Sequence, residues 1–412
     1  MRDLAKQSVN TLEAARQLRL ALNELERNPS AYRNSEAAAL YVRAALGSLT
    51  SQAVQQSARG KQSPIVPPIK QSELDTLILN PLPFDTSAAE RFDPVQLALD
   101  LIRLVNGSGG IVEQTYLYLD EPSAADWLSV CSTESFTESY RKTRPVGAVA
   151  AEVAQLVGEL PLDINALGPG DGKSEVALIG QLRDLLPVSE MRLHLLDISH
   201  SLLVAACNLA VRTFQDRHIN VLALCGDFHK LHLYEPLLAG ANAHTRRRLH
   251  TLLGYTLSNL DSELGFLDSL AAGSAPGDLC LVDLQTAVAS PDQPDEIKAK
   301  DSLFNTAPPR AYADWLTGPI RRYGGDVLEV TLEQELCTEC SVPGSYEINL
   351  IAHVELVTGQ RKGFVVGRFK RHDPTRLAEA LRARGWSVES VRLYGEPTGK
   401  GAALMLLRRA PA

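Results

Sequence analysis

The chain has 412 residues, of which 45% are hydrophobic, and a formal net charge of -8. This length and composition predict a globular protein with two or three cores of ordinary domain size. No apolar run approaches the roughly 20 residues that a membrane-spanning helix needs, and the start, MRDLAKQSVNTLEAARQ, has no apolar stretch that could serve as a signal peptide. We therefore expect a cytoplasmic protein that does not bind a membrane.

The charge pattern argues against nucleic acid as a partner, because phosphate binding needs a concentrated basic surface. We assign the only compact basic run, Arg246 to Arg248, to a solvated helix face. The six cysteines mostly stand singly in apolar runs, as small core residues do in a reducing compartment. Cys337 and Cys340 form a CxxC pair without a second pair at metal-ligand spacing, so we predict no metal site.

The N-terminal region is predicted to be helical. Apolar residues recur at helical spacing, for example at Leu12, Leu18 and Leu22, before a proline-bearing stretch that predicts a linker or an extended arm. A further helix is expected over Pro94 to Val105. We interpret residues 1–110 as a helical extension whose apolar stripe is buried against the rest of the chain, in a homodimer contact, or within a helical hairpin.

From Leu160 onward, short apolar strands alternate with amphipathic helices, in the order LDINALG, RLHLLDI, INVLALCGD, RRLHTLLGY and DLCLVDLQ. This alternation predicts an α/β fold with a parallel, doubly wound sheet. The later segments DVLEVTLEQEL, SYEINLIAHVELV and GFVVGRFK predict antiparallel strands of a smaller α+β domain. A helix over Pro374 to Arg384 and two last strands, around Trp386 to Leu393 and at AALMLLRR, complete the chain.

These patterns predict four regions. They are an N-terminal helical extension with its linker (1–110), a cofactor-binding core (111–290), a substrate or lid domain (291–373), and a C-terminal helix with strands that complete the core sheet (374–412).

A glycine-rich run, LGPGDG, spans Leu167 to Gly172 between a predicted strand and a predicted helix. Gly168, Gly170 and Gly172 allow a tight turn and a close approach of the backbone to a ligand. A plain turn or a dinucleotide site also fits this spacing. Asp171 favours a different ligand, because a carboxylate repels a pyrophosphate but tolerates a cofactor that carries a sulfonium and an amino group.

Acidic residues end the next two predicted strands. Asp197 stands where doubly wound folds place a carboxylate that holds the ribose hydroxyls of a nucleoside. Asp227 and Phe228 would offer an acceptor to an adenine amine and an aromatic wall beside its ring. Alternatively, Asp227 caps a helix and Phe228 is a core residue. In register with the glycine loop, these residues predict a nucleoside-cofactor site.

Further motifs extend this pattern from about Val112 to the C-terminus: TYLYLDEPSAADWL, ESYRKTR, LGPGDG, DIS, CGDF, LLGYTLSNLD, VDL, GRFKR and GAALMLLRR. In this order they resemble the histidine-specific, S-adenosylmethionine-dependent methyltransferases of ergothioneine biosynthesis, a class I methyltransferase family. The resemblance implies a Rossmann-like class I methyltransferase fold with an antiparallel last strand. It also implies methyl transfer from S-adenosylmethionine to the α-amine of an amino acid.

The resemblance also implies residue roles. The predicted S-adenosylmethionine contacts are Gly168, Gly170, Asp171, Gly172, Asp197, Asp227 and Phe228. Asn259 and Tyr118 match residues near the substrate amine, and we predict that they hold its lone pair in line with the methyl sulfonium. Alternatively, Asn259 caps the next helix and Tyr118 is a half-buried core aromatic. Tyr140, Tyr255 and Phe364 complete the predicted substrate site.

The acceptor residues depart from the family pattern. The family's imidazole-binding Glu and Ser precede its motif at GRFKR, where Phe364 and Val366 stand nearest. The Tyr that binds the substrate carboxylate is expected in PDQPDEIK, which has no Tyr, and the family's Tyr pair is reduced to Ser139 and Tyr140. Because the cofactor motifs remain, we expect a changed small-molecule substrate, such as the amine of another amino acid or a related metabolite.

Histidines near these motifs have two interpretations. His229 and His232 could accept the proton that an ammonium must lose before methyl transfer, but exposed helix residues explain them as well. His200, which follows Asp197, has the same ambiguity.

Two alternatives to a small-molecule methyltransferase stay open. One is a scaffold homologue that binds the cofactor without catalysis, and turnover separates it from an enzyme. The other is a methyltransferase for a protein or carrier-bound substrate that the N-terminal helices dock.

Overall fold

The structure is a computed structural model that describes residues 77–79, 101, 104, 107, 110–137, 141–186, 190–214, 219–231, 234, 238, 245–306, 308–323, 327–395 and 401–411. All of them belong to one compact unit, Gln71–Phe92 with Gln96–Ala412. The predicted N-terminal helices and their apolar stripe lie outside the described residues. Of the helix predicted over 94–105, only Leu101 and Leu104 are described, and both are helical.

The strands of this unit are β1 (Leu77–Leu79), β2 (Gly110–Ile111), β3 (Leu162–Leu167), β4 (Met191–Asp197), β5 (Asn220–Cys225), β6 (Arg247–Leu252), β7 (Leu279–Gln285), β8 (Val327–Cys337), β9 (Tyr346–Leu356), β10 (Arg361–Arg371), β11 (Trp386–Tyr394) and β12 (Ala402–Arg409). Its α-helices are α6 (Glu121–Cys131), α7 (Glu134–Phe136), α8 (Val146–Val157), α9 (Lys173–Leu185), α10 (His200–Phe214), α12 (Glu263–Gly273), α13 (Pro294–Lys300), α14 (Ser302–Asn305), α15 (Arg310–Tyr323) and α16 (Pro374–Arg382). Short 3-10 helices are η2 (Gln114–Leu117), η4 (Phe228–Lys230) and η6 (Thr256–Asn259).

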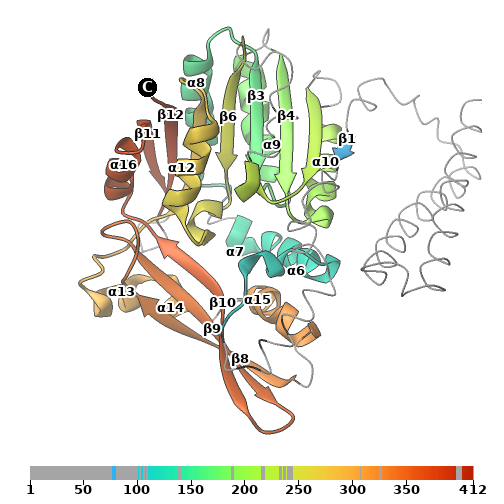
Figure 1. The fold of residues 1–412 in the computed structure, drawn as a ribbon, viewed down its shortest axis with the longest axis vertical. Helices are drawn as coiled ribbons and strands as arrows, with labels where there is room; N and C mark the ends of the chain where they lie inside the picture. Colours follow the sequence, from blue (N-terminus) through green and yellow to red (C-terminus); the bar gives the residue numbers. More distant parts are fainter. Residues whose placement is uncertain are drawn as a thin grey trace, which may run out of the picture. The chain divides into compact units, whose positions relative to one another are not determined.

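The larger sheet has the strand order β1-β5-β4-β3-β6-β7-β12-β11 (Figure 1). Its strands pair in parallel from β1 to β7, whereas β12 runs antiparallel to both β7 and β11. The chain passes from β3 through β4 to β5 and then returns to the other side of β3 for β6 and β7. This confirms the predicted doubly wound sheet with an antiparallel last strand. Such sheets bind ligands outside the carboxyl ends of the strands, where the strand order reverses.

Apolar sequence explains why the central strands are buried on both faces. Every residue of β3, LDINAL, is buried. Helices α8, α9 and α10 pack on one face of the sheet, and α12 and α16 pack on the other. Apolar runs of this kind are typical of parallel strands covered by helices on both sides.

The basic run at Arg246–Arg248 is not the solvated helix face that the sequence predicted. Arg247 begins β6. Arg246 Nε lies 2.7 Å from Asp163 Oδ1, and Arg248 Nη2 lies 2.7 Å from Asp278 Oδ2. All four of these ion-pairing residues are buried. The expectation was wrong because the carboxylate partners come from segments distant in sequence.

A second sheet, in the order β2-β10-β9-β8, forms a smaller lobe below the first in Figure 1. Its β8, β9 and β10 are antiparallel, as expected, and β2 adds to β10 in parallel. Helix α15 packs against α6 and against β8. Residues 110–131, which precede β3, and residues 288–371, which follow β7, therefore build this smaller lobe together.

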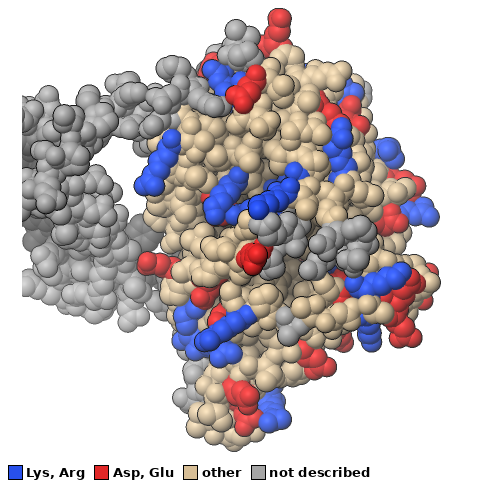
Figure 2. Space-filling view, turned by 180° about the vertical axis from the view of Figure 1, so that it is seen from behind, with Lys and Arg blue, Asp and Glu red and all other residues tan. Residues whose placement is uncertain are grey.

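Lys and Arg are interspersed with Asp and Glu over the face shown in Figure 2. Cys131, Cys207, Cys225 and Cys280 are buried, whereas the CxxC pair is half-buried. Across the described ranges, no cluster of three or more His, Cys, Asp or Glu residues could hold a metal ion. Nor does any helix in the described ranges combine the length and apolar character needed to cross a membrane.

Candidate active site

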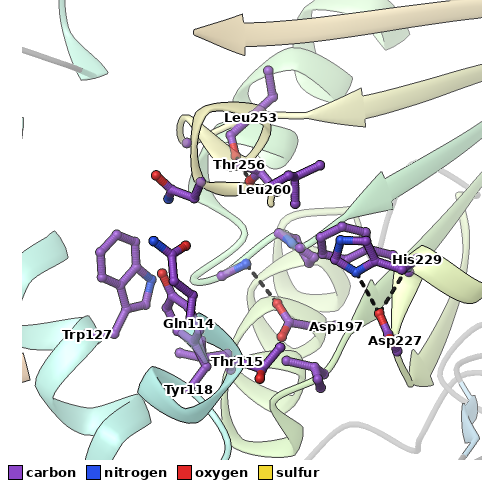
Figure 3. A pocket seen from close by; sticks show the side chains of 18 of the residues that line it. Gln114, Thr115, Tyr118, Trp127, Asp197, Asp227, His229, Leu253, Thr256 and Leu260 are labelled. Atoms are coloured by element: carbon purple, nitrogen blue, oxygen red, sulfur yellow. Dashed lines mark hydrogen bonds and ion pairs between the residues drawn. The ribbon is translucent and has the colours of Figure 1, made fainter. Parts of the chain in front are cut away.

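A cavity of about 480 Å³ opens at the carboxyl ends of β3, β4 and β5. The loops after these strands form one wall, and residues of η2 and α6 in the smaller lobe form the opposite wall. Figure 3 shows Asp197 and Asp227 on the strand side, with Gln114, Tyr118 and Trp127 across from them. The two lobes therefore meet over the edge of the sheet where the sequence motifs converge.

The glycine loop lines the cavity with its backbone. Gly168 has φ +66° and Gly170 has φ +58°, a left-handed conformation that other residues rarely adopt. A Cβ atom on Gly168 would lie 3.2 Å from Phe228 Cε1, and one on Gly170 would lie 3.2 Å from Trp127 Nε1. Because Gly168 and Gly170 carry no side chains, a ligand in the cavity can approach their backbone directly.

Asp197, the last residue of β4, is 4% exposed and lines the cavity. Its Oδ2 accepts a hydrogen bond from Gly170 N at 3.2 Å, and its Oδ1 accepts one from Ser199 N at 2.8 Å. Burial raises the pKa of this carboxyl to about 6, although backbone N–H groups oppose the shift. A carboxylate has about four lone-pair sites, so Asp197 can position the loop and still accept hydrogen bonds from ribose hydroxyls.

Asp227 caps a short helix and also lines the cavity, so its contact with an adenine amine stays a prediction. Its side chain caps η4 by accepting a hydrogen bond from His229 N at 3.0 Å, and it also lines the cavity. The Phe228 ring stacks on the His229 ring, with centroids 4.8 Å apart and 20° between the planes. These residues form a polar and aromatic end to the cavity that suits a nucleobase.

Of the three histidines considered from the sequence, the structure places one, His229, beside the cavity. His229 Nδ1 lies 2.8 Å from Asp227 Oδ1, so the ring is at the Asp227 end of the cavity. His200 is exposed at the start of α10. His232 lies outside the described residues. The proposed pairing of His229 with His232 therefore stays a prediction.

Asp171 is compensated by a cation within the protein. Arg141 Nη2 lies 2.7 Å from both carboxylate oxygens, and Lys173 Nζ lies 3.3 Å from one of them. Asp171 and Arg141 both line the cavity. The carboxylate therefore presents a smaller net charge to a ligand than the glycine loop alone suggested.

Asn259, the last residue of η6, lines the cavity on the side of β6 and β7. Ser262, not Asn259, caps α12, because its Oγ accepts a hydrogen bond from Gly265 N at 3.3 Å. Within the described part of the chain, the Asn259 side chain makes no hydrogen bond. Its amide is thus available to a ligand.

Tyr118 lines the cavity from the smaller lobe and also belongs to an aromatic cluster. Its ring centroid lies 5.7 Å from that of Trp127, nearly perpendicular at 85°, and 5.6 Å from that of Trp315. Burial raises the pKa of its phenol well above the ordinary value, so the group stays neutral at physiological pH. The two readings of Tyr118, core aromatic and cavity residue, are therefore compatible.

Three other predicted site residues, Gly172, Tyr255 and Phe364, are not among the described residues that line the cavity. Gly172 instead lets α9 approach α10, since its Cβ would lie 2.8 Å from Ala206 Cβ. Tyr255 is half-buried beside Asp283 and Tyr394. Phe364 is fully buried in the core of the smaller lobe, and Tyr140 lies outside the described residues.

Arg141 and Glu175 line the cavity but received no role from the sequence. Glu175 is only 2% exposed, in the first turn of α9. A signal for it was present, because Leu178, Ile179 and Leu182 place Glu175 on the buried stripe of that helix. Arg141 had no comparable signal, since its partner Asp171 is distant in sequence.

No protein-family model matches the chain, and no curated protein sequence matches it. Solved structures resemble it in fold. An S-adenosylmethionine-dependent methyltransferase from Clostridium acetobutylicum is 11% identical, over 70% of this chain and 99% of that one, with a TM-score of 0.37. Magnesium protoporphyrin IX methyltransferase from Synechocystis is 10% identical, over 72% of this chain and 98% of that one, with a TM-score of 0.39.

A third similar structure is 1,6-didemethyltoxoflavin-N1-methyltransferase from Burkholderia thailandensis, with S-adenosylhomocysteine bound. It is 13% identical over 71% of this chain and 92% of that one, with a TM-score of 0.36. These likenesses concern fold alone. The strand order and the antiparallel β12 of this chain are themselves those of the class I methyltransferase fold expected from the sequence.

Proposed function

We propose that this protein is an S-adenosylmethionine-dependent methyltransferase that methylates an amine of a small molecule, such as an amino acid or related metabolite other than histidine. The convergence of separate motifs at one cavity is the observation that carries the proposal. The glycine loop after β3, Asp197 at the end of β4 and Asp227 after β5 all line this cavity. Asn259 also lines it and follows β6, which lies on the other side of β3 in the strand order.

Successive residues of the cavity wall suit successive parts of this cofactor, from the adenine to the segment beyond the ribose. Phe228 and Asp227 would hold the adenine, Asp197 the ribose hydroxyls, and the backbone of Gly168 and Gly170 the segment beyond them. When bound, S-adenosylmethionine supplies a methyl group on a sulfonium. The protein contributes mainly by positioning, because a preset in-line approach of the acceptor removes much of the entropic barrier.

Asn259 and Tyr118 are the residues that we assign to the acceptor. An amide oxygen accepts hydrogen bonds from an amine, and a neutral phenol donates or accepts one. Both side chains line the cavity, and Figure 3 shows Tyr118 across it from Asp227. They would therefore orient an amine so that its lone pair faces the methyl group.

Calorimetry with S-adenosylmethionine and S-adenosylhomocysteine tests the cofactor assignment, with NAD as the control ligand. We expect binding in the micromolar range, as is common for enzymes near working substrate levels. Binding of NAD, with no binding of either adenosyl ligand, would mean that the glycine loop serves another cofactor.

Turnover is tested with methyl-deuterated S-adenosylmethionine and a panel of primary amines and amino acids, followed by mass spectrometry. A labelled N-methyl product supports the enzyme. Tight cofactor binding without a product from any acceptor class would favour the scaffold alternative.

We predict that histidine is not methylated. Phe364 and Val366, which stand nearest the family's imidazole-binding positions, are both fully buried and do not line the cavity. The family's hydrogen bonds to the imidazole are therefore missing here, and a buried polar ring that lacks its partners costs about 1–3 kcal/mol. Product assays with histidine should stay at background. Robust trimethylation of histidine would refute this prediction.

A further inference from the structure

Two charged side chains of opposite sign line the cavity next to the glycine loop, and each has a buried atom without a hydrogen-bond partner. These atoms are Glu175 Oε2 and Arg141 Nε, and their partners are missing among the residues that the structure describes. Leaving such charged atoms unpaired in a buried site is costly. A ligand that satisfies both atoms would therefore gain affinity.

The neighbouring charged residues that the structure describes do not supply partners for these two atoms, because they are engaged elsewhere. Arg141 Nη2 is engaged by Asp171, which leaves the Nε–H of the same guanidinium available. Arg144, the cation that acts most strongly on Glu175, has its own ion pair with Asp283 at 2.8 Å. Because burial outweighs these cations, the pKa of Glu175 is raised to about 8.

The position of the two residues identifies the part of a ligand that they would meet. Asp197, assigned to the ribose, accepts a hydrogen bond from Gly170 N of the glycine loop. Asp171 follows in that loop, Arg141 is bonded to Asp171, and Glu175 lies in the first turn of α9. The segment of a nucleoside cofactor beyond its ribose therefore runs toward a cation and an anion, which is the complement of a zwitterion.

We propose that Glu175 binds the α-ammonium group, and Arg141 Nε–H the α-carboxylate, of the amino-acid tail of the cofactor. This assignment rests on the proposed function, because it requires an adenosyl ligand with a zwitterionic tail. The competing explanation is structural, in which Glu175 serves only to balance Arg144.

Calorimetry on the full chain separates the two explanations. The ligands are S-adenosylhomocysteine, its deamino analogue, its decarboxy analogue, and 5′-methylthioadenosine, which has no tail. Glu175→Gln keeps the shape of the side chain and removes its charge. Glu152→Gln is the matched control, because Glu152 lies on α8 in an ion pair with Arg392, outside the cavity.

We expect Glu175→Gln to weaken binding of S-adenosylhomocysteine by about 10- to 100-fold, the effect of one charged hydrogen bond. The same substitution should leave the affinities for the deamino analogue and for 5′-methylthioadenosine unchanged. The wild type should bind the deamino analogue as weakly as the variant binds S-adenosylhomocysteine. Arg141→Gln should show the corresponding pattern with the decarboxy analogue, while Glu152→Gln should behave as the wild type.

Equal losses for all four ligands in Glu175→Gln would indicate a structural role and overturn the inference. So would an unchanged affinity for S-adenosylhomocysteine. Failure of every adenosyl ligand to bind the wild type would instead refute the proposed function, so the two failures are distinguishable.

Proton release gives an independent readout. Glu175 is faced by Arg144, Asp171 and Arg141, and arrival of an ammonium group would favour its ionised form. At pH 7, binding of S-adenosylhomocysteine to the wild type should therefore release more protons than binding to Glu175→Gln. Calorimetry in buffers of different ionisation enthalpy measures this difference, and equal release by the two proteins would contradict the ammonium contact.

Discussion

Asp197 is the residue whose substitution tests the cofactor site most directly. Asp197→Ala should weaken binding of S-adenosylmethionine by about 1.5–3 kcal/mol, because the variant loses charged hydrogen bonds to the ribose hydroxyls. Asp295→Asn, in the exposed first turn of α13, is the control and should leave affinity unchanged. Calorimetry of the two variants beside the wild type measures the effect, and an unchanged affinity for Asp197→Ala would remove this residue from the site.

The raised pKa of Asp197, about 6, gives this contact a pH dependence. Hydroxyl donors favour the ionised carboxylate, so binding lowers this pKa, and the Asp197 contact contributes fully to affinity only above about pH 6. Affinity should fall as the pH drops below that value. In Asp197→Ala the step in affinity near pH 6 should be absent.

Asn259 is expected to affect turnover more than cofactor binding. Asn259→Ala should lower kcat by about 100-fold, because loss of a positioning contact displaces the acceptor amine from the in-line approach. The dissociation constant of S-adenosylmethionine should change little. Asn305→Ala, at an exposed position at the end of α14, is the matched control. Steady-state kinetics with the acceptor found in the amine panel would test this, and an undiminished kcat contradicts the role.

Some site residues could be placed from sequence and others could not. Asp197 and Asp227 follow apolar strands, and the carboxyl ends of parallel strands meet at one edge of a sheet, so their proximity was predictable. The contact of Arg141 with Asp171 depends on how a loop folds back over the sheet. Phe364 was expected near the substrate, yet its strand turns that side chain into the core of the smaller lobe.

The turn between β3 and α9 requires a glycine at position 170, and a substitution there tests this. Gly170→Ala places a Cβ on a residue with φ +58°, 3.2 Å from Trp127 Nε1. The left-handed conformation alone costs about 1–2 kcal/mol for an alanine. We expect a lower Tm and weaker cofactor binding, because the loop must shift.

Gly180→Ala provides the comparison for that experiment. Gly180 lies within α9, and a Cβ there would meet no atom within 4 Å. In a helix interior alanine is more stable than glycine by roughly 0.5–1 kcal/mol. Its Tm should therefore stay equal or rise, as thermal denaturation would show. Equal destabilisation by both substitutions would mean that the strain at Gly170 is not the cause.

The strands were predictable because burial on two faces leaves apolar runs that can be read directly. The prediction for the arginines at the start of β6 was wrong because their burial depends on partners outside the local sequence. Taken alone, three adjacent charges indicate solvent, but Asp163 in β3 and Asp278 before β7 compensate two of them inside the fold. Such pairing joins segments that are distant in sequence, and local patterns do not contain it.

At the scale of the whole molecule, the N-terminal extension stays a prediction, because it lies outside the described residues. The sequence predicts an apolar helical stripe that includes Leu12, Leu18 and Leu22, and we expect this stripe to form a dimer contact or to help close the acceptor site. Deletion of residues 1–60 should therefore change the mass in solution or lower turnover. The measurements are light scattering, cofactor calorimetry and kinetics.

A truncated protein that is soluble, unchanged in oligomeric state and fully active would contradict this role. It would favour instead a helical hairpin that buries the stripe on itself.

The larger part of the smaller lobe, residues 288–371, leaves and rejoins the main sheet at a single junction. Thr286 and His372 form a parallel bridge, and His372 N donates to Gln285 O at 2.9 Å. Segment 288–371 is therefore an insertion whose two ends lie side by side. In evolutionary terms, recombination at this junction would exchange the insert for another whose two ends are equally close together. The strand order of the main sheet would not change. Helix α6, which packs against α15 from outside the insert, would then limit which replacements are compatible.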